Sequence, residues 1–428
     1  MHIFFSGIGG AGIGPLALIA HQAGYVVSGS DKKESAYTEY LKNHGVKLYI
    51  GQTTDQIAAA HADQPIDWLV MSSAVPLENP EHPELVFAQQ QHIKISKRDE
   101  LLNVVLQDKN LKLIAIAGTH GKTTATAMSI WAFQKLGIPI SYSVGAKTTF
   151  ADMGHFDEKS EYFVYECDEF DRNFLAFSPY ASTITTVDWD HHDIYPTRDE
   201  YKDAFRSFIQ QSAHTTMHKK DADYLDLTAS ESVTVLSEES DHTLQSIALP
   251  GAHNRQNALV VAQTLARLLE KPVNELTTIL STFPGSERRF EKLATNIYTD
   301  YAHTPEEISA TIQLAKELNN HVVVVYEPLT NKRQHFMKDL YKDIFTGVDK
   351  IYWLPSYLAR EDPNQHVLTP EELIAGLANP ERATVSELGP ELITHIREHA
   401  QAGSLVLCLA GGGGGSLDEY LRTNLKVQ

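Results

Sequence analysis

The chain has few of the features that mark secreted, membrane-bound or nucleic-acid-binding proteins. It contains two cysteines in 428 residues, Cys167 and Cys408, so neither a disulfide framework nor a cysteine-rich metal site is expected. No stretch reaches the roughly 18 uninterrupted apolar residues of a membrane span. Basic residues are also scarce, because 36 Lys and Arg stand against 55 Asp and Glu, a net charge of −19. That balance argues against nucleic acid and anionic membrane as main partners, and we expect a soluble cytoplasmic protein.

Three stretches of the chain have the pattern of a strand, a glycine-rich or turn segment, and a helix. They begin at His2, Lys112 and His321. Short β-branched runs that alternate with amphipathic helical stretches predict parallel sheets in an α/β fold. The start of the chain, MHIFFSGIGGAGIG, lacks the basic residues of a signal peptide and fits the first of these strands. Polar breaks divide the chain into predicted domains of 1–106, 107–292 and 293–428.

The sharpest local motif is a glycine-containing segment that follows an apolar strand (LKLIAIA) and opens a helix (TATAMSIWAF). Its residues are Gly118, Thr119, His120, Gly121, Lys122, Thr123 and Thr124. Glycines let successive amides point at phosphate oxygens, and the helix N-terminus adds partial positive charge. We predict that Lys122 reaches the β- and γ-phosphates of a nucleotide and that Thr123 binds Mg²⁺. The usual first glycine of such a loop is replaced by Ile116.

Two polar clusters follow the next predicted strands. One is 166–171 (ECDEFD), after the strand YFVYE, and the other is 188–193 (DWDHHD), after STITTVD. Because ligands of open α/β sheets bind at the carboxyl ends of the strands, both clusters are expected beside the phosphate loop. A carboxylate and a neutral imidazole can bind a second divalent ion, which would offset charge on a reacting phosphate. Taken alone, each cluster is equally well explained as a helix cap or a solvated loop.

The N-terminal glycines match a fingerprint of diphosphate binding. The segment GIGGAG spans 7–12, and Asp31 follows the second predicted strand near the spacing expected of a ribose-binding acid. This pattern suggests either an NAD-dependent oxidoreductase or a site for another diphosphate, such as UDP. A glycine turn without any ligand is a third interpretation. An oxidoreductase would leave the phosphate loop at 118–124 without a role.

Eight motifs occur in a fixed order along the chain. They are GIGGAGIG (7–14), SSA (72–74) with NPE (79–81), GTHGKTT (118–124), ECDE (166–169), DH (190–191), HNRQN (253–257), RRFE (288–291) and DYAHTP (300–305). In these motifs and their order, the chain resembles the Mur ligases of peptidoglycan synthesis over nearly its whole length. The resemblance implies an N-terminal Rossmann-like domain for UDP, a central ATPase domain of the phosphate-loop type, and a C-terminal Rossmann-like domain.

The resemblance also implies roles for single residues. Glu166 and His191 would hold a second Mg²⁺, besides the ion bound by Thr123. In the ATP site, Asn254 and Asn257 would lie near the adenine, Asp300 at the ribose and Arg289 near the phosphates. The incoming amino acid would meet His303 and Arg333, and the catalytic residues would be Lys122, Arg289, His303 and Arg333. The residues expected to bind the UDP-sugar are Gly9, Gly10, Ala11, Gly12, Asp31, Ser72 and Ser73.

The implied reaction joins an amino acid or short peptide to the carboxylate of UDP-N-acetylmuramate through an acyl phosphate, with ATP and two Mg²⁺ ions. L-alanine is the first expected amine, and the tripeptide L-alanyl-γ-D-glutamyl-diaminopimelate, in cell-wall recycling, is the alternative. Departures from the alanine-adding pattern leave this choice open. Thr186 stands where Asn is usual, 329–331 (LTN) where a His-Arg-Tyr run is usual, and Thr304 where a second histidine is usual.

Three other hypotheses are distinguishable from this one. An NAD-dependent oxidoreductase would rest on the glycines at 7–12 alone. A catalytically inactive, UDP-sugar-binding homologue is disfavoured because Lys122, Thr123, Glu166 and His191 are all present. A folylpolyglutamate-type ligase would lack the N-terminal UDP-binding domain that residues 1–106 are predicted to form. For the oligomeric state, we expect a monomer or a homodimer.

Overall fold

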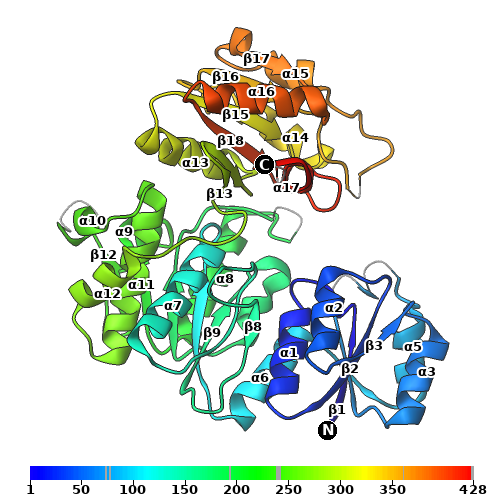
Figure 1. Cartoon of the computed structure of the whole chain (residues 1–428). Helices are drawn as coiled ribbons and strands as arrows, with labels where there is room; N and C mark the ends of the chain where they lie inside the picture. The colour runs from blue at the N-terminus through cyan, green and yellow to red at the C-terminus, as the bar shows by residue number, and fades with distance from the viewer. Residues whose placement is uncertain (73–74, 77–78, 192–193, 238–241, 360, 426–428) are drawn as a thin grey trace. The chain divides into compact units, whose positions relative to one another are not determined.

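Three β-sheets, each accompanied by helices, make up the chain (Figure 1). This computed structural model describes residues 1–72, 75–76, 79–191, 194–237, 242–359 and 361–425. Its contacts form two compact units. The first unit, Met1–Ile247 with Asn257–Phe283, contains two of the sheets, and the second, Ala248–Gln256 with Pro284–Gln428, contains the third. The predicted α/β fold with parallel sheets is confirmed.

The first sheet is parallel throughout, with the strand order β3-β2-β1-β4-β5. Its strands are β1 (His2–Ser6), β2 (Val26–Asp31), β3 (Lys47–Ile50), β4 (Trp68–Met71) and β5 (Lys94–Lys97). Its helices are α1 (Gly14–Gln22), α2 (Ala36–Asn43), α3 (Thr54–Asp63), α5 (Pro83–Gln90) and α6 (Arg98–Asp108). Side chains of the central strand alternate, so that Ile3 and Phe5 join one apolar cluster and Phe4 joins another. The apolar run HIFFS therefore serves two covered faces, as parallel sheets require.

The second sheet has the order β12-β11-β10-β6-β9-β7-β8 and is parallel except for the β7–β8 pair. Its strands are β6 (Lys112–Ala117), β7 (Ser141–Ser143), β8 (Gly154–His155), β9 (Tyr162–Glu166), β10 (Ala181–Ile184), β11 (Thr215–His218) and β12 (Val233–Leu236). The helices are α7 (Lys122–Leu136), η1 (Phe170–Ala176), α8 (Arg198–Gln211), α9 (Lys219–Tyr224), α10 (His242–Ser246), α11 (Ala252–Leu269) and α12 (Val273–Leu280). Because β6 lies between β10 and β9, the segments that follow all three strands meet at one edge.

The third sheet has the order β13-β14-β18-β15-β16-β17 and is parallel except for the β13–β14 pair. Its strands are β13 (Glu291–Ala294), β14 (Ile297–Asp300), β15 (Val322–Glu327), β16 (Lys350–Trp353), β17 (Ala383–Val385) and β18 (Leu405–Ala410). The helices are α13 (Pro305–Leu318), α14 (Asn331–Met337), η2 (Lys338–Leu340), α15 (Pro370–Ile374), η3 (Pro380–Arg382), α16 (Pro390–Gln401) and α17 (Leu417–Leu425). Along β15, Val322, Val324 and Tyr326 enter one cluster, and Val323 and Val325 enter the other. The valine run is therefore covered on both faces.

The predicted division into three domains parallels the three sheets and remains a prediction. Its first boundary, between 106 and 107, falls inside α6, and its second, between 292 and 293, falls inside β13. In the part of the chain that the structure describes, no helix combines the length and the apolar composition needed to cross a bilayer.

Candidate active site

The segment after β6 forms a tight turn that ends on the first residue of α7. Gly118 has φ 136° and Gly121 has φ 82°, a left-handed conformation that caps the helix. Both values lie where glycine is strongly favoured. A Cβ at Gly121 would stand 2.7 Å from the Asn257 amide nitrogen, so the turn also packs too closely for a side chain. The predicted arrangement of strand, glycine turn and helix is confirmed.

Residues that follow β10 fix the backbone of this turn. The Thr119 amide donates to Thr186 O at 2.8 Å, and the Thr119 hydroxyl donates to Asp188 O at 2.7 Å. The His120 amide donates to the Thr186 hydroxyl at 3.0 Å. Thr186 is one of the positions that depart from the alanine-adding pattern, and its hydroxyl supports the phosphate loop directly. This contact joins segments 66 residues apart and could not be inferred from local sequence.

Lys122 folds back over its own loop and meets a buried carboxylate. Its ammonium donates to Gly118 O at 2.7 Å, to Thr119 O at 3.3 Å and to Glu169 Oε2 at 2.7 Å. The Glu169 side chain is fully buried, and that of Lys122 is 14% exposed. Sequence reasoning named Lys122 but not Glu169, although Glu169 lies in the acidic cluster 166–171 that it had singled out.

The charges around this pair explain the titration of both groups. Burial opposes the charge on Lys122, but the carboxylates of Glu169, Asp168 and Glu166 outweigh it and raise the pKa of the ammonium. Burial raises the pKa of the Glu169 carboxyl, against the opposing effect of Lys122. The pair is therefore a desolvated ion pair, in which removal of one partner would leave an uncompensated charge.

Three carboxylates, those of Glu166, Asp168 and Glu169, lie close to Thr123 or His191. Glu166 Oε1 accepts from the Thr123 hydroxyl at 2.8 Å, and Glu166 Oε2 accepts from the Gly145 amide at 2.7 Å. His191 forms a different group, in which ligand atoms of Asp168, Glu169 and His191 all lie within 4.8 Å of one another. The structure thus places Glu166 with Thr123 and places Asp168 and Glu169 with His191. The donors are oxygens and an imidazole, a set that fits a hard divalent cation.

The two asparagines of the HNRQN motif lie one turn apart on α11. Asn257 is buried against Gly121, in the unit that carries the phosphate loop. Asn254 belongs to the segment grouped with the second unit and donates to Pro250 O at 3.0 Å. Thr124 lies in the first turn of α7.

In the first sheet, the predicted UDP-sugar residues lie at the carboxyl ends of the strands. The Gly9 amide donates to Asp31 Oδ2 at 2.8 Å, which joins the turn after β1 to the end of β2. Gly12 O accepts from the Arg98 guanidinium at 3.2 Å. The backbone from Gly9 through Gly10 and Ala11 to Gly12 forms a turn before α1. Ser72 follows β4 directly, whereas Ser73 lies outside the described residues.

In the second unit, Asp300 ends β14 and is held by backbone amides. Its two carboxylate oxygens accept from Phe290 N and Ala302 N, both at 2.7 Å. Burial raises the pKa of Asp300 from 3.8 to about 6, against the opposing effect of Arg289 and the two amides. The Arg289 guanidinium lies over the Tyr301 ring, 5.1 Å from its centre.

Segments that follow β14, β15 and β18 meet near His303. The His303 ring nitrogen Nδ1 lies 3.1 Å from Glu307 Oε2 and 3.0 Å from Tyr301 O. A Cβ at Gly411 would stand 3.1 Å from His303 Cβ and 3.2 Å from Leu329 Cδ2. The glycines after β18 thus permit a close approach of these segments. Arg333 lies in the first turn of α14, which Thr330 caps.

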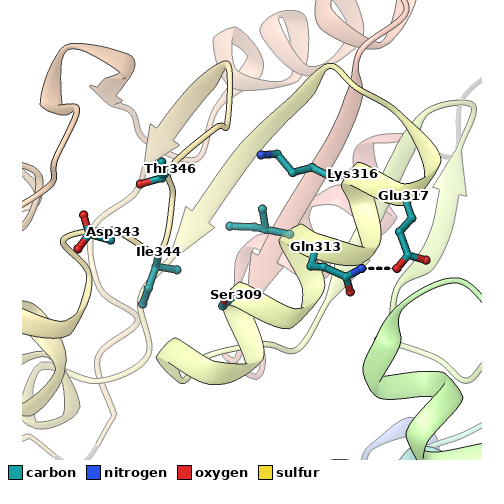
Figure 2. Close-up of a pocket in the computed structure, with 8 residues that line it drawn as sticks. Ser309, Gln313, Lys316, Glu317, Asp343, Ile344 and Thr346 are labelled. Carbon is teal, nitrogen blue, oxygen red and sulfur yellow. Dashed lines mark hydrogen bonds between the residues drawn. The ribbon is translucent and has the colours of Figure 1, made fainter. Parts of the chain in front are cut away.

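A shallow groove elsewhere in the second unit does not coincide with these residues. It has a volume of about 410 Å³ and lies between α13 and the segment before β16 (Figure 2). Gln313, Lys316 and Glu317 line it from the C-terminal half of α13, and Asp343 and Thr346 line it from the other side. These elements lead into the amino ends of β15 and β16, whereas Asp300 and His303 lie at the carboxyl end of β14.

The turn after β6 has the strand, glycine turn and helix N-terminus of a phosphate loop, an arrangement typical of nucleotide-binding α/β proteins. Three family models match successive parts of the chain: "Mur ligase family, catalytic domain" over 2–110, "Mur ligase middle domain" over 116–232, and "Mur ligase, glutamate ligase domain" over 288–412. The chain belongs to the Mur ligase family, as its motifs predicted. Enzymes of this family are ATP-dependent, ADP-forming amide ligases that use Mg²⁺, and the chain is an enzyme of this class.

Individual relatives match nearly the full length. The UDP-N-acetylmuramate–L-alanine ligase of Carboxydothermus hydrogenoformans is 31% identical over 450 residues, covering 96% of this chain and 94% of its own. The enzyme of the same name from Clostridium perfringens is 29% identical, covering 96% and 95%. The crystal structure of UDP-N-acetylmuramate–alanine ligase from Thermotoga maritima superposes with a TM-score of 0.77 at 25% identity, covering 100% and 98%. A murein peptide ligase from Psychrobacter arcticus, at 22% identity, shares the fold with a TM-score of 0.64, covering 99% and 98%.

Replacement of Gly121 by alanine is expected to weaken ATP binding by at least about tenfold. A left-handed conformation costs a residue with a Cβ about 1–2 kcal/mol, and the new methyl group would press on the Asn257 amide. Gly137 provides a matched control, because it caps the other end of α7 with φ 67° and has no atom within 4 Å of an added Cβ. Calorimetric titration should show weakened binding for Gly121→Ala and unchanged binding for Gly137→Ala. Equal effects would mean that backbone strain alone, and not the loop, is responsible.

The raised pKa of Asp300 predicts a particular pH dependence of stability. The folded chain holds the carboxyl proton of Asp300 more tightly than the unfolded chain does. The stabilisation that protonated Asp300 gives the folded state is therefore fully present below pH 3.8 and is lost as the pH rises through about 6. The free energy of unfolding of the second unit should therefore fall by roughly 2–3 kcal/mol across this window. Urea denaturation of Asp300→Asn should show a flatter profile, whereas Asp339→Asn, an exposed residue of η2, should keep the decline. An unchanged profile in Asp300→Asn would contradict the assignment.

Proposed function

We propose that the chain joins L-alanine to the lactyl carboxylate of UDP-N-acetylmuramate, with conversion of ATP to ADP and phosphate, in the synthesis of peptidoglycan precursors. The observation that carries this proposal is the buried Lys122 ammonium at the helix N-terminus of the phosphate loop, 2.7 Å from Gly118 O. The names of the full-length relatives supply the substrates. The work of such an enzyme in cell-wall biogenesis would link it to cell shape and division, and its substrates support a cytoplasmic location.

The chemistry begins with a carboxylate, which is a poor electrophile in water. Transfer of the γ-phosphoryl group of ATP to a carboxylate oxygen gives an acyl phosphate, whose phosphate is a good leaving group. The amine of L-alanine then attacks the carbonyl carbon, loses a proton and releases phosphate. Lys122 and the amides at the start of α7 would stabilise the charge that develops on the transferred group. Arg289 would add a second positive charge near these phosphates.

Two Mg²⁺ ions would offset the negative charge of the reacting phosphates, one held by Thr123 and the other by Glu166 and His191. The Glu166 carboxylate accepts from Thr123 at 2.8 Å, and His191 lies with Asp168 and Glu169, so these two carboxylates would add to the site of the second ion. Asn254 and Asn257 would contact the adenine and Asp300 the ribose. Asp300 already accepts from two amides, so a ribose hydroxyl would have to share its carboxylate.

The remaining substrate-binding roles are assigned to three proposed domains, 1–106, 107–292 and 293–428, each with one of the three sheets. Residues Gly9 to Gly12, with Asp31, Ser72 and Ser73, would bind the UDP-sugar at the first sheet. The incoming amine would be bound at the third sheet by His303 and Arg333. Glu307 lies 3.1 Å from His303 Nδ1 and would orient this ring. We further propose that the enzyme acts as a monomer or a homodimer.

The murein tripeptide is the alternative acceptor, because 329–331 (LTN) departs from the alanine-adding pattern. In the structure, Thr330 caps α14, and Asn331 bonds to the backbone at His366 and Leu368. These residues therefore fix the backbone of α14 and of a neighbouring loop, and none of the three carries a basic side chain. The relatives from Carboxydothermus hydrogenoformans and Clostridium perfringens are L-alanine ligases by name, and this supports L-alanine as the first choice.

Phosphate release from ATP and Mg²⁺ with UDP-N-acetylmuramate tests the proposal. L-alanine, glycine, L-serine and the tripeptide should be compared in parallel, and L-alanine should give the fastest release. Lys122→Ala should lower the rate by about a hundredfold or more. Lys112→Ala removes a lysine whose side chain is 43% exposed, at the start of β6, and should leave the rate unchanged. Phosphate release with the tripeptide alone would make the tripeptide the acceptor in place of L-alanine. No phosphate release with any of the amines would contradict the proposed reaction.

A further inference from the structure

The Lys122 ammonium uses all three of its hydrogen-bond donors inside the protein. Two go to the loop carbonyls of Gly118 and Thr119, and the third goes to Glu169 Oε2 at 2.7 Å. An ammonium has no further donors to offer. A nucleotide phosphate can therefore accept a hydrogen bond from Lys122 only if Lys122 releases one of these three acceptors. The carbonyls belong to a turn that Thr186 and Asp188 fix, so Glu169 is the acceptor that can exchange.

Glu169 cannot leave for solvent, because its side chain is fully buried. Its backbone carbonyl accepts from the Tyr195 hydroxyl at 2.7 Å, and the Tyr195 ring is itself buried. A carboxylate in this position that lost Lys122 would be an unpaired buried charge, which costs several kcal/mol. Release of Lys122 therefore requires that another positive charge approach Glu169.

The second carboxylate oxygen of Glu169 lies near side chains that could bind such a positive charge. Glu169 Oε1 has no hydrogen-bond partner, and His191 Nε2 lies 3.7 Å from it. Asp168 offers a further oxygen in the same group, all within 4.8 Å. Glu166 is occupied differently, by the Thr123 hydroxyl and the Gly145 amide. Of these three carboxylates, Glu169 contacts both the catalytic lysine and the histidine expected to bind a cation.

We propose that Glu169 is a positioning residue. Lys122 exchanges Glu169 for a nucleotide phosphate only when a divalent cation is bound at His191. Without a cation, Glu169 holds Lys122 and opposes phosphate by its own negative charge. With a cation, the positive charge at Asp168, Glu169 and His191 replaces Lys122 as the partner of Glu169, and Lys122 turns to the phosphate. The inference rests on the proposed function in taking the ligand of the loop to be ATP and in taking His191 to bind a cation.

The test measures ATP binding to the full chain by titration calorimetry, with excess MgCl₂ and with EDTA, in the absence of UDP-sugar and amine. Glu169→Gln keeps the shape of the side chain and removes its charge. Metal-free ATP should then bind more tightly than to the wild type, because Lys122 is left without a counterion. The ratio of the two dissociation constants, EDTA over MgCl₂, should fall by at least about fivefold, the lower end of typical coupling between two sites.

Two further variants separate this role from a structural one. Glu169→Asp retains the charge and should keep a ratio near that of the wild type. Glu161→Gln removes a carboxylate that is 2.7 Å from Lys112 but 59% exposed, just before the start of β9, and should change neither constant. Thermal unfolding of each variant checks that the chain is folded.

The outcomes are distinct. A lowered ratio in Glu169→Gln, with a preserved ratio in Glu169→Asp, supports the inference. If both ATP constants change by the same factor, if none changes, or if Glu169→Asp behaves like Glu169→Gln, Glu169 does not couple the cation to Lys122. If the wild type binds no ATP under either condition, the proposed function itself fails, and that result is separable from a failure of the Glu169 inference alone.

Discussion

The arrangement of the candidate active site depends on one buried ion pair, between Lys122 and Glu169, at the end of a central strand. β6 lies between β10 and β9, so the parallel sheet delivers three segments to one edge. The segment after β6 supplies the lysine, the one after β9 supplies the carboxylates, and the one after β10 supplies the hydroxyl of Thr186. Gly121 lacks the Cβ that would otherwise clash with the Asn257 amide nitrogen at 2.7 Å. The site therefore follows from strand order as much as from the residues of the motif.

Sequence reasoning identified the elements and the family but not the pairing inside the site. The β-branched runs, the glycine turn and the helix that follows were sufficient to predict β6, the phosphate loop and α7. The acidic cluster was predicted to lie beside the loop, yet spacing could not tell whether the carboxylate at 166, 168 or 169 would face Lys122. That choice depends on how the chain turns after β9, where Asp171 takes φ 54° and the backbone leaves the strand direction. Long-range contacts of this kind leave no local signal.

The third sheet shows how a departure from a family pattern can acquire a structural role. At 329–331, where basic and aromatic side chains are usual in alanine-adding relatives, Thr330 caps α14 and Asn331 bonds to two backbone groups of a distant loop. Leu329 lies beside the glycines that follow β18. Recognition of the amine would then rest on His303 and Arg333, with fewer basic groups than the pattern supplies. The acceptor is accordingly the part of the function that sequence likeness constrains least.

The central claim is that a carboxylate is activated by phosphoryl transfer at the loop that holds Lys122. The most direct measurement follows oxygen from UDP-N-acetylmuramate whose lactyl carboxylate carries ¹⁸O, during turnover with ATP, Mg²⁺ and L-alanine. An acyl phosphate requires that one labelled oxygen pass to the released phosphate for every amide bond formed, and mass spectrometry of that phosphate detects it. Labelled phosphate in equal amount to the product would agree with this account. Unlabelled phosphate, with ATP consumed and the amide formed, would contradict it.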